Sequence, residues 1–297
     1  MKQALFALLF ISLSVNAQTT LRAKAHFTDP SSTTPVFIDE IHVTGTRSLD
    51  STQLNEIVGP LNQRKVGGTE EIRDRLRFRF QDYGYFLVDV KSVNVKRLDP
   101  LASLPPVDVE AEVEEGPRFR FDSVQFTGNH AISTEELLRH LPIHKGEYFS
   151  RTKAGSGLNA LREAYGKLGY IDFIAVPGTK LSPSDATIKL LIDVNEGRQF
   201  RMGKLQFAGN SDLADQLRPL WKLETGAPYD TSYFTEFFKE NESLLPPNFV
   251  ASRSTKIARN CQDNTVTVFV ELGQNHPAVP VPDDVGCEQS SEKTSQQ

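Results

Sequence analysis

One seventeen-residue segment occurs twice in the chain, and this repeat constrains the fold more than any other feature. VEEGPRFRFDSVQFTGN begins at Val113, and VNEGRQFRMGKLQFAGN begins at Val194, 81 residues later. Nine of the seventeen positions are identical in the two copies. Self-similarity at a fixed spacing indicates a duplicated structural unit, and about 80 residues is the size of a small domain. The chain is therefore expected to be a series of small domains.

The residues between the two copies indicate the order of elements in one unit. Residues 121–126 alternate apolar and polar side chains, as a strand with one buried face does. Ser133 and Glu136 have the spacing of a capping box, so a helix is expected to begin there. Expected after it are a second helix from Ser150 and strands over residues 170–176 and 187–194. One unit therefore has the order β-α-α-β-β.

The same order can be followed before and after this middle unit. A Gly-Tyr pair precedes the second strand at Gly84 and at Gly169, whereas LLPPNF, from Leu244, stands at this place in the third copy. The junction between helix and strand in the third unit is therefore left open. The units are expected over residues 36–117, 118–198 and 199–273.

The two ends of the chain are expected to lie outside these units. Residues 1–17 have a positive start, an apolar run and a small-residue cleavage pattern, which are typical of an export signal. The apolar run has twelve residues, too few for a membrane-spanning helix, which needs about 20. Residues 18–35 are expected to be a linker, and residues 274–297 a polar, disordered tail.

Charge and cysteine content limit the partners and the covalent bonds. The net charge of −5 gives no overall basic field, so no nucleic-acid partner is expected. Cys261 and Cys287 are the two cysteines of the chain. In an oxidising compartment such a pair can form a disulfide, and two independent thiols are the alternative.

Two groups of residues resemble known sites but lack essential features. His140, His144 and Glu147 have a spacing found in helical metal sites, but Pro142 interrupts the helix that would align them. AGSGL, from Ala154, lacks the spacing of a nucleophile elbow and the lysine of a phosphate-binding loop. We therefore expect no catalytic residue, no metal and no cofactor. An envelope hydrolase whose site the sequence does not show stays an alternative.

Four features recur in the units: a strand that ends in Gly-Asn, two helices, a Gly-Tyr before the second strand, and a strand that ends in Glu-Gly. With these features the units resemble POTRA (polypeptide-transport-associated) domains of outer-membrane protein assembly factors of the BamA type. The resemblance implies an α+β fold of three tandem domains, each a three-stranded mixed sheet covered by two helices. Such factors continue into a membrane barrel, whereas this chain ends in a polar segment, so we expect no barrel.

The resemblance also implies where polypeptides would bind. In that family the second strand is a free sheet edge, to which an extended segment of another chain can add. The candidate edge residues are Phe86, Val88, Val90, Ile171, Phe173, Ala175, Phe249 and Ala251. The alternative is that these side chains simply pack the sheets.

The resemblance implies a function without catalysis. The protein would be an exported scaffold or chaperone-like protein, periplasmic and associated with the outer membrane. Its partners would be unfolded or nascent outer-membrane or secreted polypeptides, together with a separate barrel or the subunits of an assembly complex. A detached or truncated periplasmic portion of an outer-membrane translocase is the alternative.

Overall fold

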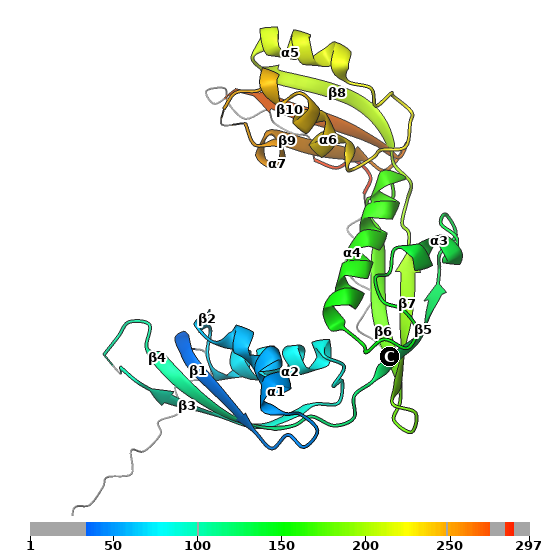
Figure 1. Ribbon diagram of the computed structural model, residues 1–297. Coiled ribbons are helices and arrows are strands. Elements are labelled where there is room, and N and C mark those ends of the chain that lie inside the picture. The colour runs from blue at the N-terminus through cyan, green and yellow to red at the C-terminus, as the bar shows by residue number, and fades with distance from the viewer. Residues whose placement is uncertain (1–33, 100, 248, 274–282, 288–297) are drawn as a thin grey trace, which may run out of the picture.

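Three sheets, each with its own helices, make up the described part of the protein. The computed structural model describes residues 34–99, 101–247, 249–273 and 283–287. The expected export signal, most of the expected linker and most of the expected tail lie outside these residues. The three units follow one another along an open arc (Figure 1).

The first unit has a four-stranded sheet. Its elements are β1 (Val36–Thr44), α1 (Ser51–Val58), the 3-10 turn η1 (Gly59–Leu61), β2 (Arg64–Val66), α2 (Thr69–Asp82), β3 (Asp89–Arg97) and β4 (Pro106–Glu114). The strand order is β2-β1-β4-β3, in which β1 and β4 are parallel and the other pairs antiparallel. The repeat predicts three strands here, so β2 is an addition. Its three residues are too few to show an alternating pattern.

The second and third units have the three-stranded mixed sheet that was predicted. The second unit contains β5 (Arg120–Thr127), α3 (Thr134–Arg139), α4 (Arg151–Lys167), β6 (Ile174–Ser182) and β7 (Thr187–Asn195). The third contains β8 (Arg201–Gly209), α5 (Ser211–Leu217), η2 (Arg218–Leu220), α6 (Tyr233–Glu240), η3 (Glu242–Leu244), α7 (Ala251–Ser254), β9 (Thr255–Asn260) and β10 (Thr265–Leu272). The strand orders are β5-β7-β6 and β8-β10-β9, with the first strand parallel to the central one.

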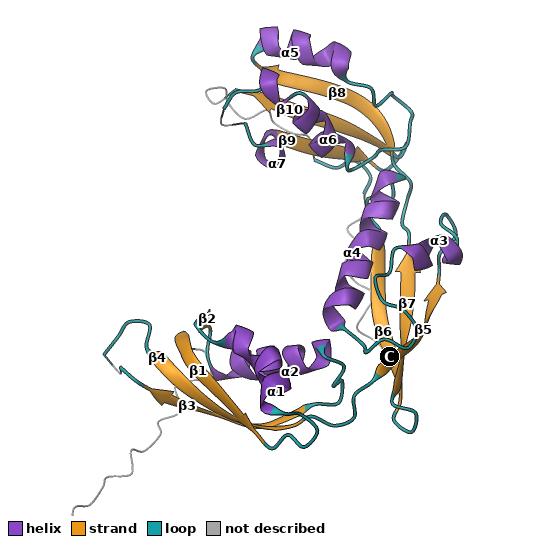
Figure 2. Ribbon diagram, viewed as in Figure 1, coloured by secondary structure: helices purple, strands orange, loops and turns teal. Residues whose placement is uncertain are grey.

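Each unit packs its helices against one face of its sheet (Figure 2). Along β4 and β7, the central strands of the first two units, buried and less buried side chains alternate. Every second side chain is apolar and faces the helices. The buried residues that the three central strands contribute to the cores are Val107, Val109, Ala111 and Val113, Ile188, Leu190, Ile192 and Val194, and Val266, Val268, Val270 and Leu272. Each unit therefore has a hydrophobic core of its own.

Helix starts in the second unit follow the predicted caps, with one difference. The side chain of Ser150 accepts a hydrogen bond from the N–H of Lys153 at 3.1 Å, as a cap does. Ser133 accepts from the N–H of Glu136 at 3.3 Å. The Glu136 carboxylate binds Arg139. Of the two contacts of the predicted capping box, the structure therefore has the serine contact and not the glutamate contact.

The acid–Gly motif of the repeat closes the loop that follows the first strand of a unit. The Oε1 atom of Glu115 accepts hydrogen bonds from the N–H groups of Arg47 and Ser48, at 2.6 and 2.7 Å. In the second unit Glu196 makes the same pair of bonds to the loop after β5, at 2.6 and 2.8 Å. This contact explains why an acid–Gly turn and a Gly loop recur together in the first two units.

We expect Glu115→Gln to lower the free energy of unfolding of the first unit by about 1–3 kcal/mol at neutral pH. Burial opposes ionisation of Glu115, but the N–H groups of Ser48 and Arg47 outweigh it and hold the pKa of this carboxyl below its ordinary value. The stabilisation is thus present above the unfolded-state pKa and is lost as the pH falls through the folded-state pKa. Urea unfolding should show a deficit at neutral pH that shrinks in acid. The exposed Glu112 on β4, the strand that ends just before Glu115, gives the control, Glu112→Gln. A Glu115→Gln variant as stable as wild type at neutral pH would contradict this role.

Candidate functional site

The second long strand of every unit lies at one edge of its sheet. These strands are β3, β6 and β9, which pair on their inner sides with β4, β7 and β10. Within the described ranges, no strand pairs with the outer side of β3 or β6. An unpaired edge presents N–H and C=O groups that can bind another extended chain. These edges are therefore the candidate binding sites.

Most of the predicted edge residues lie before these strands instead of on them. Phe86, Val88, Ile171, Phe173, Phe249 and Ala251 precede the strands, while Val90 lies on β3 and Ala175 on β6. The segment after the Gly-Tyr turn is used for packing. The Phe173 ring stacks on Tyr165, with centroids 4.3 Å apart, and the Phe86 ring meets Phe149 of the next unit edge-on at 5.6 Å. The structure thus places six of the eight candidates outside the edge strands.

The other displaced residues also pack the units. Val88 is buried in the first core, and Ile171 packs against the core of the third unit. Phe249 lies beside Phe238, with ring centroids 4.8 Å apart, and Ala251 begins α7. A short helix thus occupies the junction that the sequence left open.

The second half of β3 is an open edge. The N–H of Leu98, just beyond the strand, donates to the carbonyl of Pro106 on β4 at 2.9 Å. Groups that point toward and away from a neighbour alternate along an antiparallel strand. The backbone groups of Val93, Val95 and Arg97 therefore point away from β4. Among the described residues, no strand pairs with the outer side of this half of β3.

The first half of β3 is closed by its own unit. Arg73 on α2 donates from Nη1 to the carbonyl of Val90 at 2.5 Å. The register then shifts between Val90 and Ser92, so that Lys91 forms a bulge, a feature that disrupts pairing along a strand. Val90, although on the edge strand, is therefore a poor binding position.

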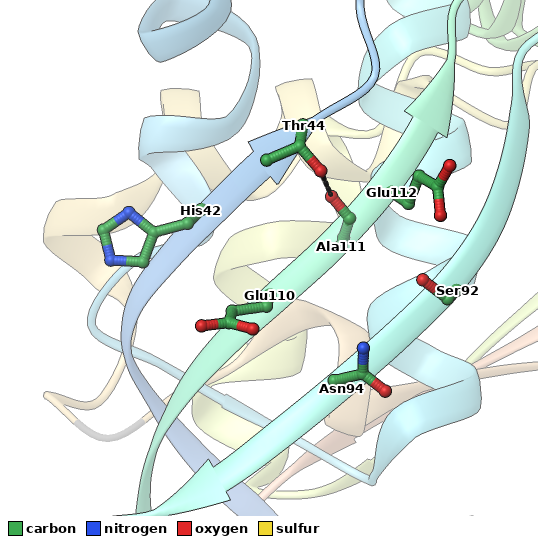
Figure 3. Close-up of a pocket in the computed structure, with 7 residues that line it drawn as sticks. All are labelled: His42, Thr44, Ser92, Asn94, Glu110, Ala111 and Glu112. Carbon is green, nitrogen blue, oxygen red and sulfur yellow. Dashed lines mark hydrogen bonds between the residues drawn. The ribbon is translucent and has the colours of Figure 1, made fainter.

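The outer face of the first sheet, next to this edge, is polar. Figure 3 shows the side chains around a depression on this face: His42 and Thr44 on β1, Glu110, Ala111 and Glu112 on β4, and Ser92 and Asn94 on β3. The opposite face of β3 carries Val93 and Val95, which pack on the first core. A strand added to β3 would therefore meet polar groups on one face and apolar groups on the other.

The edge of β6 is interrupted by a proline. Pro177 pairs in register with Ile192 of β7, and a proline is tolerated in an edge strand where its nitrogen faces away from the sheet. It thus removes a donor from the open row, which is one way in which proteins protect edges. The outer face of β6 begins with two exposed apolar side chains, Ile174 and Val176, which are 51% and 60% exposed.

The edge of β9 is partly covered by a segment from beyond the third sheet. Val285 forms a parallel bridge with Asn260, and the structure has a disulfide between Cys261 and Cys287. Residues 283–287 belong to the segment that was expected to be disordered. For these described residues that expectation is wrong, because main-chain hydrogen bonds to β9 hold them.

The Gly-Tyr turns form the joints between successive units. The carbonyl of Gly84 accepts a hydrogen bond from the N–H of Phe119 at 2.7 Å, and the carbonyl of Gly169 accepts one from Phe200 at 2.8 Å. Phe119 and Phe200 are both completely buried in the core of the following unit. The first residue of each new core is thus fixed to the turn of the unit before it.

Side chains repeat this attachment one residue earlier. Arg118 donates from Nε to the carbonyl of Tyr83 at 2.7 Å, and Gln199 donates from Nε2 to the carbonyl of Leu168 at 3.0 Å. Both carbonyls precede the glycine of a Gly-Tyr turn. The two joints therefore share one geometry.

The first joint also connects two helices. Asp82, the last residue of α2, accepts hydrogen bonds from the hydroxyl of Ser150 at 2.6 Å and from the N–H of Thr152 at 2.8 Å, at the start of α4. A carboxylate is unfavourable at the C-terminal end of its own helix but favourable at the N-terminal end of another. The position of Asp82 is the sequence signal that could have revealed this contact.

These features can be compared with known proteins. Residues 119–197 match the family described as "POTRA: Surface antigen variable number repeat". The middle unit is a POTRA domain. The crystal structure of Haemophilus influenzae BamA POTRA3-5 superposes on the chain with a TM-score of 0.58 at 20% identity, covering 82% of this chain and 99% of that one. The chain thus has the fold of tandem POTRA domains.

Curated relatives of this chain are longer proteins. "Outer membrane protein assembly factor BamA" of Neisseria meningitidis is 24% identical over 151 residues, which are 47% of this chain and 19% of the relative. A "Putative outer membrane protein assembly factor" of Treponema pallidum is 23% identical over 252 residues, 81% of this chain and 30% of the relative. The chain therefore spans less than a third of the length of these relatives.

The described residues contain neither a membrane-spanning helix nor a cluster of metal ligands. None of the described helices combines the length and apolar character that crossing a membrane requires. In the ranges that the structure describes, no three His, Cys, Asp or Glu side chains are placed to hold a metal ion.

Proposed function

We propose that the protein is a non-enzymatic periplasmic scaffold that holds extended polypeptide segments during outer-membrane protein assembly, by strand addition to its sheet edges. The names of the curated relatives and the POTRA fold support the assembly role. The open second half of β3 is the observation that carries the binding mode. Its partners would be unfolded outer-membrane or secreted polypeptides and the subunits of an assembly complex.

The chemistry of β3 fits the segments that such a scaffold would hold. Main-chain bonds to Val93, Val95 and Arg97 do not depend on the sequence of the bound segment, so binding would be broad. The two faces beside the edge differ, because Ser92 and Asn94 are polar whereas the valines are apolar. An alternating segment would satisfy both faces, and outer-membrane β-strands alternate in this way.

We expect Arg97→Pro to reduce the binding of such segments about tenfold, because it removes one outward N–H and obstructs the incoming strand. Arg97 is exposed at the end of β3, and its N–H is not used by β4, so the fold should survive. A photo-crosslinking residue at the exposed Lys96 would report binding in intact envelopes, and circular dichroism would report folding.

The matched control is Arg97→Ala, which removes the same side chain but keeps the N–H. It should retain most of the crosslinking to outer-membrane proteins. If a folded Arg97→Pro variant crosslinks as strongly as Arg97→Ala, strand addition at β3 is excluded.

A further inference from the structure

The segment at Val285 binds β9 as an added strand would. The N–H of Val285 donates to the carbonyl of Arg259 at 2.9 Å, and the carbonyl of Val285 accepts from the N–H of Cys261 at 2.8 Å. Val285 thereby forms a parallel bridge with Asn260. The outward groups at this end of the β9 edge are therefore already occupied.

An acidic side chain reinforces this contact. Asp284 accepts a hydrogen bond from the backbone N–H of Arg259 at 2.8 Å, and it also accepts from Nε and Nη2 of the same arginine at 2.8 and 2.6 Å. A carboxylate held by two guanidinium donors is a strong and directional contact. Arg259 thus binds an acidic side chain next to the backbone that is bound at this edge.

The covered edge lies at the joint between the second and third units. Arg259 also donates from Nη1 to Asp172 of the second unit at 2.5 Å. Arg198, between the two units, donates to the carbonyl of Cys261 at 2.6 Å. The edge is thus held in place by groups outside the third sheet.

The disulfide fixes the segment to the strand that it covers. Cys261 is buried directly after β9, and Cys287 lies two residues beyond Val285. The main chain already tethers the segment to the third unit, and the disulfide adds a second covalent link next to β9, which raises the effective concentration that a free competitor must overcome. Without the disulfide, two main-chain bonds and the contacts of Asp284 with Arg259 would hold the segment to β9.

We propose that residues 284–287 are a built-in occupant of the β9 edge, and that reduction of the Cys261–Cys287 disulfide opens this edge to an extended acidic segment of another chain. A dithiol supplies the reduction: the S–S bond breaks, two electrons and two protons pass to the cysteine sulfurs, and the dithiol leaves as a disulfide. The inference rests on the proposed function in one respect, that strand addition is the binding mode. It concerns a different edge from β3.

The test uses the full chain and a photo-reactive peptide that copies residues 281–287 with the Cys287→Ser replacement. Adducts are mapped by mass spectrometry, so that capture at residues 255–261 is separated from capture at β3. The Cys287→Ala variant should give at least tenfold more adduct on β9 than the oxidised wild type. A peptide that also carries Asp284→Asn should bind about tenfold more weakly than the acidic peptide. Equal capture by the two proteins, no capture by either, or equal capture of the two peptides would overturn the proposal.

Hydrogen exchange of the reduced wild-type protein provides a second readout that needs no variant and no client. The amides of Arg259 and Cys261 should exchange at least tenfold faster after reduction, while those of β10 keep their protection. Unchanged exchange at both amides, or equal loss of protection throughout β10, would refute a releasable cover. A failure of β3 to bind clients would leave both results unaffected, so the two proposals can fail separately.

Discussion

Gly169→Ala is expected to break the joint between the second and third units. Gly169 has φ of +86°, and a Cβ atom there would lie 2.3 Å from the carbonyl oxygen of Phe200 and 3.1 Å from the nitrogen of Tyr229. Both atoms belong to the backbone of the third unit, so the clash is relieved by moving that unit away. The strained backbone adds about 1–2 kcal/mol. Spin labels at the exposed Glu163 and Asp215 would report one narrow distance distribution in the wild type and a broad one in the variant.

Gly146→Ala is the matched control for this prediction. Gly146 has φ of +87°, almost the same as Gly169, but a Cβ atom there would have nothing within 4 Å. The control therefore carries the backbone strain without the clash, and its distance distribution should stay narrow. Equal broadening in both variants would show that strain alone, and not contact across the joint, determines how the units are arranged.

Phe119→Ala is expected to destabilise the second unit by about 3–5 kcal/mol, because a completely buried phenylalanine leaves a large cavity. Phe119 is also the residue whose N–H is bound by Gly84, so core and joint depend on one position. Hydrogen exchange resolved by residue should show β5 and β7 losing protection while β1 and β4 keep theirs.

The control for this substitution is Phe78→Ala, since the Phe78 side chain is 37% exposed on α2. It should cost much less stability. Loss of protection in all three units of the Phe119→Ala variant would contradict the separate cores described above, because it would mean that the units unfold as one.

The repeat predicts the three units and their common β-α-α-β-β order, because both follow from local patterns, but it does not predict β2 or α7. The sequence shows the Gly-Tyr turn as a recurring feature but not its role. Its glycine carbonyl binds Phe119 or Phe200 of the next unit, and a contact between units leaves no periodicity in the sequence.

The position of β6 shows where an apolar run misleads. Residues 170–176 are apolar except for Asp172 and are expected to form a strand, but Phe173 packs in the core against Tyr165, and the strand begins at Ile174. The expected strand ends at residue 176, whereas β6 continues through Pro177 to Ser182, because an edge position tolerates a residue without an N–H. For this reason most candidate binding residues lie before the edge strands instead of on them. The open half of β3 could not be derived from the sequence, because it depends on the register between β3 and β4.

Direct observation of the β3 amides tests the central claim most sharply. Hydrogen exchange of Val93, Val95 and Arg97 should be measured in the full chain with and without a saturating, unfolded outer-membrane protein segment. Strand addition predicts that these outward amides become protected on binding, while Ser92 and Asn94, already bonded toward β4, change little. Protection confined to the helices or to the outer sheet face, with the three outward amides unchanged, would contradict the account.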